Sequence, residues 1–236
     1  MFDLSEKGRG IRAMFNDIAP RYDLLNRLLS LGIDRSWRRF AVGQLQIPPG
    51  GMVLDMATGT GDVALEIASR TPDSVMIIGE DFTQGMLLKG REKIAASPYR
   101  HRIELVNAPC EAIPHPDNLF DGVTIAFGIR NVVDRQAGLA EMCRVLKPGG
   151  RAVILEFSTP SNPLFKAIYT TYFHQILPTI GGLLSKRSAY KYLPDSVAGF
   201  PPQEQFKSMM RDAGFIDVRH HDLTFGIASV YVGVCP

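Results

Sequence analysis

The sequence predicts an α/β fold whose sheet is mostly parallel, has seven strands and ends in an antiparallel C-terminal hairpin. Between residues 52 and 158, short apolar runs alternate with helical stretches, which is typical of a parallel sheet covered by helices on both faces. The last two β-rich runs, in residues 216–235, have no helix between them. They must pair antiparallel, because a parallel return needs a crossover of about a dozen residues or more.

The elements follow one another in a regular order. Residues 9–45 are predicted to be helical, with interruptions at Pro20 and Gly32, and the "IPPGG" break at 47–51 ends them. Strands are then expected at 52–57, 74–81, 102–108, 120–129 and 151–158. Helices are expected at 62–70, 82–97, 135–150 and 202–215.

The composition indicates one globular domain over residues 1–236, with an N-terminal helical cap (1–46) and an insertion on the substrate side (159–200). The net charge of +2, without a basic run, argues against a nucleic-acid partner. We expect a cytoplasmic chain, because there is no signal-peptide pattern and no apolar run of about 18 residues. Three cysteines without a CxxC pair argue against disulfides and a metal site.

A glycine-rich turn, "GTGDVA" at residues 59–64, follows the first predicted strand. It fits the pattern of dinucleotide-binding turns. Asp81 ends the second strand, 20 residues after Gly61, where an acid that binds a ribose is expected. A dinucleotide and S-adenosylmethionine both contain an adenosine ribose, so Asp81 is compatible with either cofactor.

Asp55 favours S-adenosylmethionine. It lies at the end of the first strand, where it is expected to face the crevice at the carboxyl ends of the strands. A carboxylate about 4 Å from a pyrophosphate would cost on the order of 1–4 kcal/mol, whereas the same charge attracts an ammonium and a sulfonium. The alternative is that Asp55 caps the amides of the turn. With the closing hairpin, which is unusual for nicotinamide-binding domains, the cofactor interpretation predicts a Rossmann-like class I methyltransferase.

The chain resembles one family over nearly its whole length, and four stretches carry the resemblance. "YDLLNRLLSLGIDRSW" (22–37) and "RVLKPGGRAVILEFS" (144–158) are similar to its two signatures, as are "FGIRN" (127–131) and "YKYLPDSVAGFP" (190–201) to other family stretches. The family is that of the quinone-biosynthesis C-methyltransferases, which methylate demethylmenaquinol and its benzoquinol counterpart. The chain departs from the signatures at Leu25, Asp34 and Ala152.

The resemblance implies S-adenosylmethionine as cofactor and assigns residues to it. Gly59 and Thr60 would form the turn beside the cofactor, and Asp81 would bind the ribose. Cys110, with the proline before it, would lie at the adenine edge. A slipped alternative gives that role to 107–108, "NA", through a longer loop.

The resemblance also implies a site for the quinol at the end of the fourth strand. Arg130 stays protonated, so we expect it to stabilise the phenolate oxygen and not to act as a base. Asn131 could hydrogen-bond the other ring oxygen. The alternative for Arg130 is an ion pair with Asp134 that staples the loop. Tyr22, on the N-terminal helices, is a candidate for contacting the substrate or relaying the proton; its alternative is a half-buried tyrosine on an amphipathic helix.

An apolar stripe at helical spacing covers residues 165–180 of the insertion. Such a stripe more often packs into a core, but its place in the insertion favours a groove for an isoprenoid tail. The basic stretch "SKRSAYKY" (185–192) follows it, which suits anionic headgroups. We therefore expect transient peripheral contact with the cytoplasmic membrane face, and a homo-oligomer is compatible with the sequence.

These observations predict a C-methyltransferase that converts demethylmenaquinol to menaquinol. Methylation of the polyprenyl benzoquinol of ubiquinone synthesis, instead or as well, is the nearest alternative. A nicotinamide-linked oxidoreductase is disfavoured by Asp55. A non-catalytic scaffold is disfavoured by the intact turn together with Asp81, Arg130 and Asn131.

Overall fold

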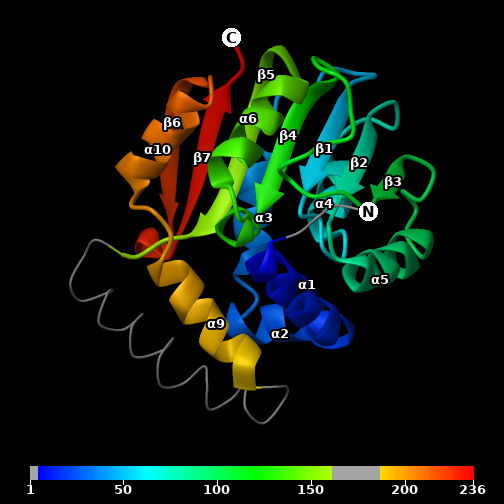
Figure 1. The fold of residues 1–236 in the computed structure, drawn as a ribbon. Helices are drawn as coiled ribbons and strands as arrows, with labels where there is room; N and C mark the ends of the chain where they lie inside the picture. The colour runs from blue at the N-terminus through cyan, green and yellow to red at the C-terminus, as the bar shows by residue number, and fades with distance from the viewer. Residues whose placement is uncertain (1–4, 161–186) are drawn as a thin grey trace.

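The computed structural model of the chain describes residues 5–160 and 187–236. A seven-stranded sheet with the order β3-β2-β1-β4-β5-β7-β6 runs through it (Figure 1). The strands are β1 Met52–Met56, β2 Met76–Glu80, β3 Ile103–Val106, β4 Phe120–Ala126, β5 Leu146–Phe157, β6 Ile216–Leu223 and β7 Ala228–Val234. Strands β1 to β5 are parallel, and β7 runs antiparallel to both β5 and β6. The predicted fold class is confirmed.

Helices cover both faces of this sheet, because strand residues alternate between the faces. The helices are α1 Glu6–Ile18, α2 Tyr22–Leu29, α3 Asp34–Val42, α4 Asp62–Arg70, α5 Gln84–Ala95, α6 Arg135–Val145, α9 Arg187–Ala198 and α10 Gln203–Asp212, with the 3-10 turns η1 Ala19–Arg21, η2 Ile129–Asn131 and η4 Thr224–Gly226. Leu54 and Met56 of β1 belong to the buried cluster that includes α6 and α10, whereas Val53 belongs to the cluster with α4.

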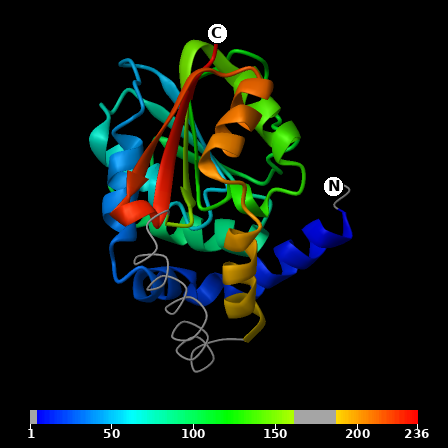
Figure 2. The same cartoon turned by 90° about the vertical axis from the view of Figure 1, so that its left-hand side faces the viewer.

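The first two helices and α9 lie beyond the carboxyl ends of the parallel strands. Figure 1 shows the arrowheads of β1 and β4 pointing toward them, and Figure 2, turned by 90°, shows them at the same end of the sheet. We call α1, η1 and α2 the cap. The third N-terminal helix, α3, leaves the cap and packs on the sheet. There Trp37 is 5% exposed, its ring lies 6.1 Å from that of Phe127, and its indole N–H donates to Thr224 Oγ1 at 2.8 Å.

Two elements differ from the sequence prediction. Strand β5 begins at Leu146 and not at 151, because the Lys-Pro-Gly-Gly stretch continues the ladder with a register shift, and Gly149 takes a φ of +80° there. Helix α9 was not predicted; it contains Pro194, which ordinarily interrupts a helical pattern. The apolar stripe at 165–180 lies outside the described residues.

Candidate active site

The glycine turn after β1 is tied to the end of β2. The Asp81 carboxylate accepts the backbone N–H of Gly59 at 2.9 Å and that of Thr83 at 2.7 Å. Gly59 and Gly61 have φ values of +58° and +81°, in the left-handed region that favours glycine. The turn therefore needs its glycines for backbone shape, and Asp81 fixes it at the point where the strands end.

A cavity of about 730 Å³, measured to its open mouth, lies beside this turn. Five of the residues predicted for the site line it together: Tyr22 from the cap, Gly59 from the turn, Asp81 directly after β2, Cys110 from the loop after β3, and Asn131 from η2. A bare glycine backbone, a carboxylate at the strand end and apolar walls fit an adenosine-containing group. The sequence prediction thus brings together residues that are up to 109 positions apart.

Asp55 lies beneath the turn and is not among the described residues that line the cavity. Its two carboxylate oxygens accept the hydroxyl protons of Thr58, at 2.6 Å, and Thr124, at 2.7 Å. Burial raises the pKa of Asp55 to about 6, although these hydrogen bonds act in the opposite direction. In this geometry Asp55 stabilises the turn. This agrees in part with the alternative interpretation, in which Asp55 caps the turn. Contact between Asp55 and the cofactor stays a prediction.

The loop after β3 carries the residues predicted for the adenine edge. Cys110 and the residues on either side of it line the cavity, and burial raises the pKa of the Cys110 thiol, so the thiol stays neutral. The slipped alternative fits less well, because the Asn107 side-chain amide donates to the backbone carbonyl of Asp81 at 2.7 Å. The Asn107 side chain therefore braces the backbone just after β2, while Ala108, the other residue of that alternative, lines the cavity.

A second cavity, of about 820 Å³, lies between the cap and α9. It shares the side chains of Phe15, Tyr22 and Phe127 with the first cavity. Its other lining residues include Ile18, Asn26, Arg130, Tyr192 and Leu193. The two cavities therefore adjoin at Tyr22, so a donor in one and an acceptor in the other would meet beside this ring.

Arg130 in the second cavity is buried and ion-paired. Its guanidinium donates to Glu156 Oε1 at 2.6 Å and to the Phe127 carbonyl at 2.6 Å, and it lies 5.4 Å from the ring centre of Phe157. Its Nε has no hydrogen-bond partner within residues 5–160 and 187–236. The proposed pair with Asp134 is not formed; Asp134 instead caps α6 by accepting the N–H of Ala137.

Two residues of this region were missed by sequence reasoning. Glu156 is fully buried at the carboxyl end of β5, next to Arg130. A single acid inside the apolar run "AVILEF" is the signal that could have found it. Tyr192 of α9 donates its hydroxyl proton to Asn131 Oδ1 at 2.8 Å, a contact that no local pattern indicates.

Tyr22 is held protonated by its surroundings. Burial raises its pKa above the ordinary value, a larger effect than the hydrogen bond with Asn26 that lowers it. A neutral hydroxyl at the boundary of the two cavities can donate or accept a hydrogen bond but is a weak base. Around the second cavity the site offers the hydroxyls of Tyr22 and Tyr192 and the guanidinium of Arg130, and Asn131 lies on the wall of the first cavity.

The chain is similar to known proteins over nearly its full length. The chain matches the ubiE/COQ5 methyltransferase family over residues 2–235. It is 66% identical over 233 residues to a ubiquinone/menaquinone biosynthesis C-methyltransferase UbiE of Geobacter sulfurreducens. The aligned region covers 99% of this chain and 91% of that protein. A demethylmenaquinone methyltransferase of Deinococcus radiodurans is 50% identical over 232 residues, 98% of this chain and 95% of that one.

Solved structures share the fold at low sequence identity. A SAM-dependent methyltransferase from Aquifex aeolicus superimposes with a TM-score of 0.60 at 17% identity, covering 84% of this chain and 89% of that one. The [4+2]-cyclase SpnF gives 0.72 at 15% identity, covering 97% of each chain, so the fold alone does not fix the chemistry. The full-length match and the identities are decisive: the chain belongs to the ubiE/COQ5 methyltransferase family and uses S-adenosylmethionine as its methyl donor.

Proposed function

We propose that this chain methylates a ring carbon of a polyprenylated quinol, converting demethylmenaquinol to menaquinol. The observation that carries the proposal is the pair of adjoining cavities, one beside the glycine turn and one lined by Arg130, which share Tyr22 as a wall. The benzoquinol of ubiquinone synthesis is the second candidate, because the names of the relatives mention both quinones.

The residues of the second cavity suit the chemistry of ring methylation. A quinol carbon becomes nucleophilic when a hydroxyl ortho or para to it loses its proton and the charge spreads over the ring. Arg130 stabilises that charge, because a guanidinium stays protonated at any physiological pH. Glu156 fixes the orientation of Arg130 through the 2.6 Å ion pair. Bound S-adenosylmethionine supplies the methyl group, and the ring carbon then gives up its proton to restore aromaticity.

Tyr22 and Asn131 complete this assignment. Asn131 is anchored by Tyr192 through its Oδ1, so its amide nitrogen is directed by α9 and is suited to hydrogen-bond a ring oxygen. Tyr22 separates donor and acceptor and contacts both. Both roles rest on the position of each side chain in a cavity wall.

The test uses the purified chain with methyl-labelled S-adenosylmethionine and either demethylmenaquinol or the matching benzoquinol, each with a short isoprenoid tail. We expect label in the ring of the naphthoquinol product, identified by mass spectrometry, at a higher kcat/KM than for the benzoquinol. Equal turnover of both quinols would favour the dual role. Methylation of neither, with tight nicotinamide binding, would refute the proposal.

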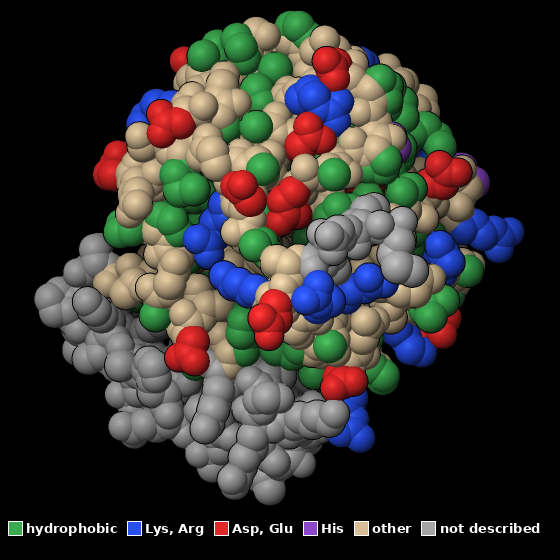
Figure 3. Space-filling model, viewed as in Figure 1, with side chains coloured by type: hydrophobic (Ala, Val, Ile, Leu, Met, Phe, Trp, Pro, Cys, Tyr) green, Lys and Arg blue, Asp and Glu red, His purple; other side chains and the backbone are tan. Residues whose placement is uncertain are grey.

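We further propose reversible contact with an anionic membrane surface, where a polyprenylated substrate resides. No helix within the described part of the chain is long and apolar enough to cross a bilayer. Figure 3 shows basic side chains gathered in a band across one face, near the level where the cap meets the sheet. Sedimentation with vesicles should show more bound protein on anionic than on neutral lipid, and salt should remove the difference. Equal sedimentation with both lipids would contradict this proposal.

A further inference from the structure

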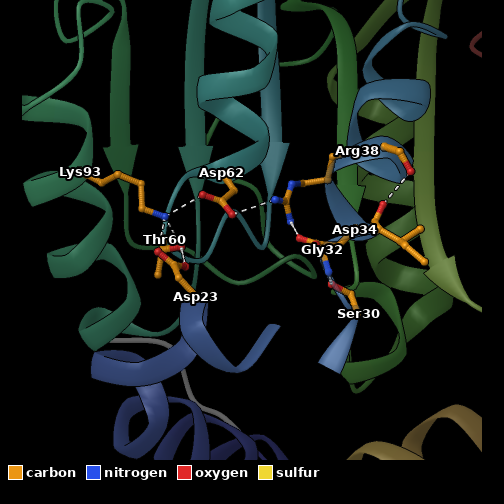
Figure 4. Close-up of polar contacts among 10 residues, drawn as sticks. Asp23, Ser30, Gly32, Asp34, Arg38, Thr60, Asp62 and Lys93 are labelled. Atoms are coloured by element: carbon orange, nitrogen blue, oxygen red, sulfur yellow. Dashed lines mark hydrogen bonds and ion pairs between the residues drawn. The ribbon is translucent and has the colours of Figure 1, made fainter. Parts of the chain in front are cut away.

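We propose that Asp23 and Lys93 are positioning residues: they fix helix α2 against the glycine turn, and thereby set the place of Tyr22 between the two cavities. The inference rests on the proposed function, because it concerns the residues that hold one wall of the proposed quinol cavity in place. The first part of the contacts, around Asp23 and Lys93, is not among the residues that line either cavity, whereas the second part, Ser30, Asp34 and Arg38, also lines the second cavity. Figure 4 shows these contacts as a chain of charged and hydroxyl side chains.

The first part of the chain surrounds Thr60 of the turn. The Lys93 ammonium contacts Asp23 Oδ2 at 2.5 Å, Asp62 Oδ1 at 2.7 Å and Thr60 Oγ1 at 3.0 Å, which uses all three of its protons (Figure 4). The Thr60 hydroxyl donates in turn to Asp23 Oδ1 at 2.5 Å. The sequence predicts Thr60 as part of the turn beside the cofactor. In the structure the Thr60 side chain connects this turn to the cap.

The second part of the chain reaches the other end of α2. Asp62 Oδ2 lies 3.1 Å from Arg38, whose guanidinium contacts Asp34 Oδ2 at 2.6 Å. Asp34 Oδ1 accepts the hydroxyl proton of Ser30, the residue directly after α2, at 2.6 Å. Helix α2 is therefore held at its first turn and just past its last residue, both times through Asp62 at the start of α4.

The Arg38–Asp34 pair is better shielded than an ordinary surface ion pair, whereas the side chains of Asp23 and Asp62 are 42% and 37% exposed. The side chains of Arg38 and Asp34 are 12% and 9% exposed, and that of Lys93 is 29% exposed. Burial alone would raise the pKa of Asp62, yet the positive charges of Arg38 and Lys93 outweigh it and lower the pKa. By contrast, Lys89 on the same helix as Lys93 pairs only with Glu92, at 43% and 66% exposure, and provides a matched control.

Tyr22 is the residue through which the contacts of Asp23 act on the site. Its ring lies 3.8 Å from where a Cβ of Gly59 would stand, which is van der Waals distance, so the ring borders the turn at Gly59. The turn itself is held separately by Asp81 and by the Asp55–Thr58 bond. Loss of the Asp23–Lys93 pair should therefore displace Tyr22, the wall that both cavities share, while leaving the glycine turn and Asp81 in place.

The experiment compares Asp23→Asn, Lys93→Met, Thr60→Val and Thr60→Ser with the Lys89→Met control. For the first three variants we expect kcat/KM for the quinol to fall at least about tenfold, through both kcat and KM, with the affinity for S-adenosylmethionine within about threefold of the parent. Thr60→Ser keeps the hydroxyl and should restore most of the activity. Lys89→Met should behave like the parent chain.

A second measurement does not depend on the quinol. Amide hydrogen exchange should become several-fold faster in α2 of Asp23→Asn and Lys93→Met, with α4 unchanged. If the parent chain methylates no quinol, the proposed function fails, whereas the exchange data still decide whether Asp23 and Lys93 fix α2. Unchanged exchange in α2, quinol kinetics within twofold of the parent, or an equal loss of cofactor affinity would each overturn the inference. Melting curves identify any variant that fails to fold. In that case the comparison of Thr60→Val with Thr60→Ser decides the test.

Discussion

Arg130 combines two tasks in one buried side chain, since it pairs with Glu156 and lines the acceptor cavity. Removing it entirely would leave a buried carboxylate without a partner, at a cost of about 3–5 kcal/mol in folding stability. Arg130→Lys keeps the charge but loses the planar geometry of the guanidinium. We expect turnover to fall about 100-fold, with cofactor affinity within about threefold and melting changed by only a few degrees. Steady-state kinetics and calorimetric titration measure this; a matching loss of cofactor affinity would contradict the assigned role.

We expect Asp81 to make cofactor binding depend on pH. Burial raises its pKa to about 6, more than the N–H groups of Thr83 and Gly59 lower it. The folded state therefore keeps a proton that the unfolded state has lost between about pH 4 and 6. The free energy of unfolding contributed by this group falls as pH rises through that window and is constant above it.

Binding of ribose hydroxyls favours the ionised form of Asp81, so cofactor affinity should follow the opposite trend. We expect the dissociation constant to rise up to about tenfold for each pH unit below 6 and to level off above that value. Calorimetric titration from pH 5 to 8 measures it. Asp81→Asn should bind more weakly, and the part of the pH dependence due to Asp81 should be lost; an unchanged profile would refute this role.

Helix α9 lines the acceptor cavity with Tyr192 and Leu193, and the Tyr192 hydroxyl also donates to Asn131, which lines the first cavity. Tyr192→Phe removes that bond and keeps the ring, at a cost of about 1 kcal/mol. The KM for the quinol should rise about fivefold, with cofactor affinity unchanged, in steady-state kinetics. A change in cofactor affinity instead would show that α9 acts on the first cavity.

Among the described elements, the strands and the N-terminal helices were easier to predict than helix α9 of the insertion. Each of β1 to β4 is an apolar run with a turn signal after it, so its local sequence is sufficient. Helix α9 carries Pro194 and depends on tertiary contacts, which a local pattern does not report. The early start of β5 similarly depends on pairing with β4 across a register shift.

The site residues divide in the same way at the scale of the molecule. Gly59 and Asp81 could be predicted because a parallel sheet brings the ends of neighbouring strands to one edge. The partner of Arg130 could not be predicted, because the choice between Glu156 and Asp134 depends on how β5 and η2 meet in space. For the same reason the sequence did not show that the Thr60 hydroxyl bonds to the cap and that Asp55 lies under the turn.

The intact fold should be stabilised by its cofactor. A ligand at about 100 times its dissociation constant adds about 2.7 kcal/mol to the stability of the folded state. For a chain of this size that corresponds to a rise of roughly 5–10 °C in the melting temperature. Differential scanning fluorimetry should show this rise with S-adenosylmethionine and none with NAD. A rise with NAD alone would contradict the assigned cofactor.

Trp37 is the only tryptophan of the chain, and its ring lies 6.1 Å from that of Phe127, which borders both cavities. Its emission therefore originates from a single known place, immediately behind the wall that the donor and the acceptor share. The molecule carries an optical reporter of its own, and the filling of each compartment can be followed in real time without attaching a dye.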